Sequence, residues 1–169
     1  MIHITKSFGP ERYLVSSNPY IKSGITMQLS RFSDYTLRVL FYVATHTDRL
    51  STLSEIATFY DISIEHLRKV VHALGKRGYL STFRGKKGGI CLARPPEQIN
   101  IGEVVAHSEG TSPLVDCNSQ PCRLAGQCTL QGALARAQQA FFDTLKEYTL
   151  ADLLRSDSMQ ANLITRTNS

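Results

Sequence analysis

The sequence predicts a mainly α-helical fold with a small β-wing, namely a winged helix-turn-helix domain followed by a long dimerisation helix. Three observations predict it. Two amphipathic segments are joined by a short polar turn, two β-like runs flank a glycine-rich basic stretch, and a long apolar stripe at helical spacing comes later. The helix-turn-helix and its wing occupy about Leu53 to Leu92, inside a domain of residues 27–100.

The first predicted helix follows an extension without periodicity. We interpret residues 1–26 as disordered, or as a stretch that precedes the natural start or was added to the chain. Ser33 is a plausible N-cap for the helix that follows. Apolar residues then recur at three- and four-residue steps: Leu37, Leu40, Phe41 and Ala44.

The next two helices fit the helix-turn-helix template. Thr52 and Glu55 have the spacing of a capping box, and the turn Asp61-Ile62-Ser63 separates the two helices. Ser63 can cap the third helix, which ends before Gly78. The second helix is expected to bury Leu53, Ile56, Ala57 and Tyr60, and the third Ile64, Leu67, Val70, Val71 and Leu74.

A basic hairpin follows at once and predicts the wing. The β-like runs 79–83 and 90–92 enclose Arg84-Gly-Lys-Lys-Gly-Gly, which is rich enough in glycine for a tight turn. Arg94-Pro95-Pro96 then ends the domain, because consecutive prolines end regular structure.

Charge favours a nucleic-acid partner for this domain. Residues 27–100 carry eleven Lys and Arg against six Asp and Glu, whereas residues 101–169 carry five against seven. An ordinary solvated surface is the alternative, but the turn length and the basic wing together favour double-stranded DNA. The candidate DNA-binding residues are Ser63, Glu65, His66, Arg68, Lys69 and His72 on the third helix, with Arg84, Lys86 and Lys87 on the wing.

The C-terminal part predicts a dimer. Residues 101–128 hold a short helix, Ile101 to Glu109, and a loop, and residues 129–155 form one long helix before a flexible tail, 156–169. Little chain remains to cover the apolar stripe of the long helix, so a second subunit is the favoured partner. The stripe comprises Leu130, Leu134, Ala137, Phe141, Leu145 and Tyr148.

The loop carries three cysteines in the pattern Cys117-x4-Cys122-x5-Cys128. Thiolates suit zinc or an iron–sulfur cluster, although the paired Cys-x2-Cys of most zinc sites is missing. Redox-active or buried thiols are the alternative. A fourth ligand is missing locally; Asp116 adjoins the first cysteine, and His107 is the nearest histidine. Cys91, on the wing, is interpreted as a core residue.

Other function classes receive little support. No stretch approaches the roughly 20 apolar residues that span a bilayer, and the N-terminus lacks an apolar export signal, so we expect a cytoplasmic protein. The sequence has no Cys-x-x-Cys motif, nucleotide-binding glycine loop or nucleophile–base pair. We therefore do not expect an enzyme.

The combination of winged helix-turn-helix, cysteine loop and long helix resembles the NsrR-type nitric-oxide-sensing repressors. They belong to a group of winged-helix regulators that also includes IscR. The segments that carry the resemblance are Met27-Gln-Leu-Ser-Arg-Phe-Ser-Asp-Tyr, Arg84-Gly-Lys-Lys-Gly-Gly, the cysteine loop and Tyr148-Thr-Leu-Ala-Asp-Leu. The extension and Cys91 depart from the family pattern. The resemblance implies a repressor of nitrosative-stress genes that binds its operator as a homodimer and is released when its cluster is nitrosylated.

The resemblance also implies a ligand set. Cys117, Cys122 and Cys128 of one subunit would hold an iron–sulfur cluster with Asp34 of the partner subunit, which favours [4Fe-4S] over [2Fe-2S]. IscR-like proteins have a histidine ligand where this chain has Gln131. The alternative function is a regulator of the same fold that senses iron–sulfur status or redox state.

Overall fold

The computed structural model describes residues 28–117, 119 and 121–165, so the extension 1–26 lies outside the described residues. It confirms a mainly helical fold with a two-stranded antiparallel sheet. The first half contains α1 (Arg31–Thr45), α2 (Leu53–Tyr60), α3 (Ile64–Lys76), β1 (Leu80–Phe83), β2 (Gly89–Leu92) and the 3-10 helix η1 (Pro96–Gln98). The second half contains α4 (Ile101–Glu109), α5 (Thr129–Lys146), α6 (Leu150–Leu153) and α7 (Asp157–Thr165).

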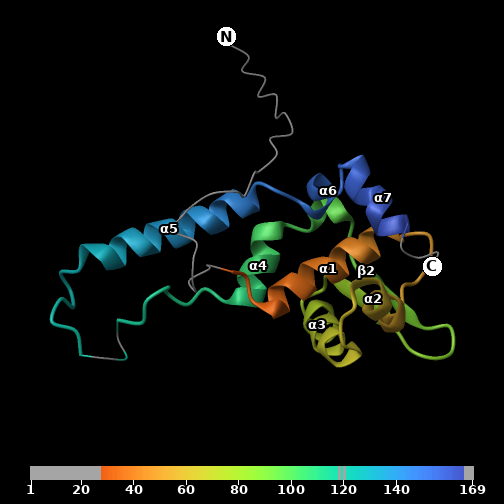
Figure 1. The fold of residues 1–169 in the computed structure, drawn as a ribbon, viewed down its shortest axis with the longest axis horizontal. Helices are drawn as coiled ribbons and strands as arrows, with labels where there is room; N and C mark the ends of the chain where they lie inside the picture. The colour runs from red at the N-terminus through yellow and green to blue at the C-terminus, as the bar shows by residue number, and fades with distance from the viewer. Residues whose placement is uncertain (1–27, 118, 120, 166–169) are drawn as a thin grey trace, which may run out of the picture.

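Helix α1 lies in the middle of the molecule and packs against α3, α4 and β2 (Figure 1). Its N-cap is Ser30, not Ser33, because the Ser33 backbone N–H donates to Ser30 Oγ at 3.2 Å. Its buried face is also wider than the sequence predicts. Leu40 is buried as expected, and Val39, Tyr42 and Val43 are buried as well, because neighbours pack on more than one side of α1.

The helix-turn-helix forms as predicted in most respects. In the capping box of α2, Thr52 Oγ1 accepts from the Glu55 N–H at 3.2 Å and Glu55 Oε2 accepts from the Thr52 N–H at 2.7 Å. Ser63 takes the N-cap position of α3 without a side-chain hydrogen bond. The predicted core residues of α3 are buried except Ile64, which is 38% exposed, so the apolar face begins one turn later.

The wing pairs Leu80 with Leu92 and Phe83 with Gly89. A side chain at Gly89 would place its Cβ only 2.7 Å from Leu50 Cβ, so the close approach of the α1–α2 linker requires glycine there. The linker is held to the wing by two backbone bonds between Ser51 and Ile90, at 2.9 and 2.7 Å. The wing is therefore anchored to the start of the helix-turn-helix.

The C-terminal half differs from the predicted single helix and flexible tail. Helix α5 ends at Lys146 because the chain then pairs with the segment before α4: Tyr148 O accepts from Ile101 N–H at 3.0 Å, and Leu150 N–H donates to Ile99 O at 2.8 Å. Residues 157–165 form α7, which packs on α1 and buries Leu163. None of the helices in the described ranges is long and apolar enough to cross a membrane.

Candidate nucleic-acid interface and metal-binding loop

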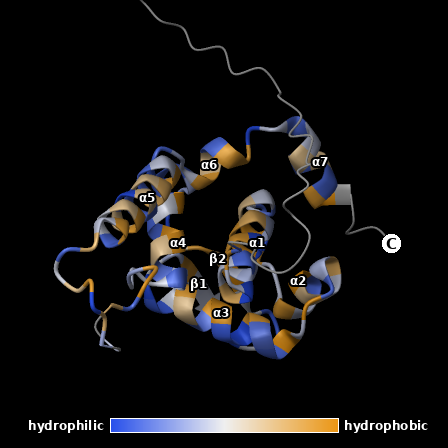
Figure 2. Cartoon of the chain, turned by 60° about the vertical axis from the view of Figure 1, so that its left-hand side comes forward, coloured by the Kyte–Doolittle hydropathy of each residue, from blue (hydrophilic) through white to orange (hydrophobic). Residues whose placement is uncertain are grey.

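The outer face of α3 presents the predicted DNA-binding residues. Helix α3 lies at the lower edge of the molecule in Figures 1 and 2, and Figure 2 shows both hydrophilic and hydrophobic residues along its ribbon. The buried Leu67, Val70 and Leu74 fix the inner face. All the side chains predicted to contact DNA from this helix are exposed: Ser63, Glu65, His66, Arg68, Lys69 and His72.

Three of these side chains have contacts within the chain. Glu65 and Arg68 form an ion pair one turn apart, and both are well exposed, so the pair contributes little stability but orients the Arg68 guanidinium. The His66 ring lies 6.1 Å, between centroids, from the ring of Tyr35 on α1. The start of α3 is thus partly ordered before any partner binds.

The wing tip presents Arg84, Lys86 and Lys87, all exposed, on the turn between β1 and β2. Arg94 belongs to the same basic segment, but its side chain packs against the protein. Its guanidinium lies 4.6 Å from the Tyr79 ring centroid and donates to Gly78 O and Arg77 O, both at 3.1 Å. Three of the four side chains are therefore available to phosphates.

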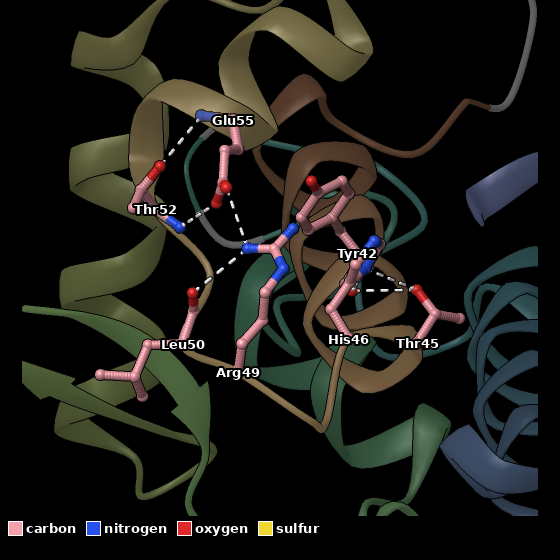
Figure 3. Close-up of polar contacts among 7 residues, drawn as sticks. All are labelled: Tyr42, Thr45, His46, Arg49, Leu50, Thr52 and Glu55. Carbon is pink, nitrogen blue, oxygen red and sulfur yellow. Dashed lines mark hydrogen bonds and ion pairs between the residues drawn. The ribbon is translucent and has the colours of Figure 1, made fainter. Parts of the chain in front are cut away.

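A polar network that sequence analysis missed supports the start of α2 (Figure 3). Arg49 Nη1 donates to Glu55 Oε1 at 2.9 Å and to Leu50 O at 3.3 Å. Burial alone would raise the pKa of Glu55, but hydrogen bonds from the Thr52 backbone and Arg49 outweigh it and keep the pKa below its ordinary value. Arg49 follows α1 in an exposed linker, so only its six-residue spacing to Glu55 could have suggested the pair.

The cysteine loop has neither helix nor strand among its described residues, 111–117, 119 and 121–128. It extends along α5, away from α2 and α3 (Figure 1). Cys117, Cys122 and Cys128 are free thiols. Within the ranges that the structure describes, no three His, Cys, Asp or Glu side chains gather closely enough to hold a metal ion, so this single chain does not assemble the predicted site.

The donor set nevertheless fits an iron–sulfur cluster in its chemistry. The three thiols stand on backbone outside helices and strands, and Cys128, the N-cap residue of α5, makes no side-chain capping bond. Large apolar side chains on the same loop are solvent-exposed, as expected where a further component covers them: Leu114 at 48%, Val115 at 45% and Leu124 at 62%.

The other acidic and histidine candidates already have partners. Both carboxylate oxygens of Asp34 accept from Arg38 Nε at 2.9 Å, and the Arg38 guanidinium lies 5.5 Å from the Tyr60 ring centroid. His107 Nδ1 is hydrogen-bonded to Tyr79 Oη at 3.0 Å, and Asp116 Oδ1 accepts from the Ser119 N–H at 3.1 Å. Asp34 is therefore held by Arg38 of its own helix in this chain.

The end of α4 connects the cysteine loop to the start of α1. Ser33 Oγ, in the first turn of α1, donates to Ser108 Oγ at 2.7 Å, and the Ser30 N–H donates to Glu109 Oε1 at 2.6 Å. Burial opposes ionisation of Glu109, yet the hydrogen bonds from Ser33 and Ser30 keep its pKa below the ordinary value. The helix that leads into the cysteine loop thus also supports the start of the helix that carries Asp34.

Comparison with known proteins gives a consistent result. The sequence model of the Rrf2 family, described as iron-dependent transcriptional regulators, matches residues 29–156. The HTH-type transcriptional regulator NsrR of Halalkalibacterium halodurans is 45% identical over 142 residues, which cover 81% of this chain and 97% of that protein. NsrR of Shouchella clausii is 43% identical over 146 residues, covering 83% of this chain and 98% of that protein.

A solved structure supports the same fold. The oxidised form of CymR from Staphylococcus aureus superposes with a TM-score of 0.63 at 27% sequence identity, covering 77% of this chain and 98% of that one. The match spans nearly the whole of the known structure, so the two proteins share their overall fold.

Proposed function

The chain belongs to the Rrf2 family of iron-dependent transcriptional regulators, and from this premise we propose that it is a nitric-oxide-sensitive repressor that depends on an iron–sulfur cluster. It is a transcriptional regulator and not an enzyme. The observation that carries the finer proposal is the combination of high identity to regulators named NsrR with the three loop cysteines and Asp34. We further propose that it acts on nitrosative-stress genes in the cytoplasm.

The DNA contacts divide between α3 and the wing. Arg68, Lys69 and the two histidines at 66 and 72 can read base edges in the major groove, because an exposed helix of this width fits there. Arg84, Lys86 and Lys87 hold the phosphate backbone. Glu65 contributes by holding the Arg68 guanidinium through their ion pair.

The exposed apolar surface of α5 supports the proposed homodimer. This eighteen-residue helix buries none of its residues within the single chain. Leu130 is 61% exposed, and Leu134, Phe141 and Leu145 remain half-buried. A second copy of the chain would cover this stripe and place two α3 helices on successive major grooves.

Each cluster is proposed to be held by Cys117, Cys122 and Cys128 with Asp34 of the partner subunit, in the [4Fe-4S] form. When bound, the cluster supplies iron that reacts with nitric oxide. The carboxylate of Asp34 would be a harder and weaker partner for iron than a thiolate, and so would be the ligand most readily released. Within its own chain, Arg38 is ready to accept the released carboxylate.

Release of Asp34 would allow the two DNA-binding domains to leave the relative arrangement that fits the operator. A difference of about 3 kcal/mol between the two arrangements lowers operator affinity more than a hundredfold, within the usual range of allosteric coupling. The relevant test is a titration of operator DNA with cluster-loaded protein, purified without oxygen, before and after measured additions of nitric oxide.

We expect a loss of affinity that follows the loss of cluster absorbance. Unchanged affinity after nitric oxide would overturn the sensor proposal. Affinity that follows cluster loading but ignores nitric oxide would assign the protein to sensing of iron–sulfur status instead. Colourless protein with one zinc per chain would overturn the cluster itself.

A further inference from the structure

Three consecutive residues at the end of α4 bond to the DNA-binding domain. Glu109 and Ser108 hold Ser30 and Ser33 of α1, and His107 Nδ1 is hydrogen-bonded to Tyr79 Oη at 3.0 Å. Gly110 follows directly, with a φ of 79° that ends the helix, and the cysteine loop begins there. The loop is therefore directly continuous with the end of α4 at one end, and with α5 at the other.

Tyr79 links the parts that would contact DNA. Its side chain is 2% exposed, its N–H donates to Leu74 O in α3 at 3.0 Å, and its carbonyl accepts from the Ala93 N–H at 3.0 Å. Since Ala93 directly follows β2, these two bonds fix the end of α3 to the exit of the wing. Arg94 stacks on the ring and bonds to the turn between α3 and β1.

The Tyr79 hydroxyl is the polar end of this buried side chain. Its hydrogen-bond partner, His107, lies outside the helix-turn-helix and the wing. Burial, followed by the nearby charge of Arg77, lowers the pKa of His107, which favours the neutral ring. Burial also raises the pKa of Tyr79, which keeps the phenol protonated. A neutral imidazole and a protonated phenol are suited to a stable hydrogen bond.

We propose that His107 is a positioning residue, which couples the orientation of α3 and the wing to the state of the cysteine loop through its hydrogen bond with Tyr79. The inference rests on the proposed function, because it names the route by which the loop acts on the DNA-binding domain. It predicts that this bond is intact when the loop is ordered by its ligand and is weakened when the ligand is lost.

The test compares His107→Ala, His107→Asn and Tyr79→Phe in the full-length, cluster-reconstituted protein. Asparagine keeps a hydrogen-bonding atom near the position of Nδ1, whereas alanine does not. Thr47→Ala is the control, since it removes a hydroxyl from an exposed side chain in the linker after α1 that has no proposed role in DNA, cluster or subunit binding. The first readout is the ratio of operator affinities with and without the cluster.

In His107→Ala and Tyr79→Phe we expect this ratio to fall at least tenfold from that of the wild type, with the cluster absorbance unchanged. His107→Asn and Thr47→Ala should keep most of the ratio. An unchanged ratio in His107→Ala would overturn the proposal. Equal losses in His107→Asn and His107→Ala would overturn it too, because the hydrogen bond would then not be the coupling element.

A second readout separates this inference from the proposed function. Amide hydrogen exchange in the wing should accelerate when a chelator removes the cluster from the wild type, and it should already be fast in loaded His107→Ala. If wild-type affinity ignores nitric oxide but exchange follows this pattern, the sensor proposal fails and the coupling stands. If wing exchange is the same in all variants and states, the coupling is wrong.

Discussion

Residues 28–100 and residues 101–165 differ in how much of their apolar surface a single chain covers. In the first region α1, α3 and the wing bury Val39, Leu40, Leu67 and Ile90 almost completely. In the second region α5 has no fully buried residue, although Phe141 and Leu145 pack partly against the core, and the loop before it exposes Leu114 and Leu124. The core of the first region is closed by its own elements together with α4 and α7, whereas α5 and the loop leave apolar surface uncovered. We propose that a second subunit and a cluster cover that surface.

The largest expected effect comes from the loop cysteines. Cys117→Ser, Cys122→Ser or Cys128→Ser should lower operator affinity by about a hundredfold, because each removes a ligand of the proposed cluster. Iron content and visible absorbance measure the cluster, and fluorescence anisotropy measures DNA binding. Cys91→Ser, on β2, is the matched control and should behave as the wild type. If Cys91→Ser and Cys122→Ser were equally affected, the loop would have no special role.

The next effect concerns the uncovered stripe of α5. The double variant Leu130→Glu/Leu134→Glu should be monomeric at micromolar concentration in sedimentation experiments, because it places charges in the proposed interface. Arg136→Glu, exposed on the same helix, should remain dimeric. Since these positions are exposed or half-buried in the chain, unfolding free energy should change by less than about 1 kcal/mol. A dimeric double variant would contradict the proposed interface.

A smaller effect is expected at the wing. Lys86→Ala/Lys87→Ala should weaken DNA binding about tenfold and reduce its salt dependence by about two counterions, since each lysine is proposed to neutralise one phosphate. The loss should be similar for operator and unrelated DNA. An unchanged salt slope would show that the wing does not contact phosphates.

The smallest effect is expected at the start of α2, within residues 28–100. Thr52→Ala removes one half of the capping box of α2 and should cost about 1 kcal/mol in chemical denaturation. Ser54→Ala, exposed on the same turn, is the control and should be near neutral. A Thr52→Ala protein as stable as the control would mean that the cap contributes nothing to this region.

The same cap predicts a pH dependence. The pKa of Glu55 is lowered in the folded state, so its stabilising contribution is complete above its unfolded value of 4.5 and is lost as pH falls through the lower folded value. The stability difference between the wild type and Glu55→Gln should therefore be present at pH 7 and shrink below about pH 4. A difference that is constant with pH would contradict the ionised role of Glu55.

The sequence predicted the helix-turn-helix well because its signals are local. Thr52 and Glu55 are three residues apart, and the glycine-rich hairpin is contiguous. The predicted single helix was wrong beyond Lys146. The hydrogen bonds that end α5 join Tyr148 and Leu150 to residues far back in the chain, which no local pattern reveals. The Arg38 partner of Asp34 was equally hidden, since an ion pair one turn apart is common on any exposed helix.

The central claim is that each cluster site combines the loop of one chain with Asp34 of the other, and mixed dimers test it most directly. Two chains with different tags, one Asp34→Ala and one Cys117→Ser, are co-expressed and purified without oxygen as heterodimers. The account predicts that half of the sites recover the wild-type cluster absorbance and its response to nitric oxide, because one loop and one Asp34 remain paired across the interface. A heterodimer without any wild-type-like site would contradict it.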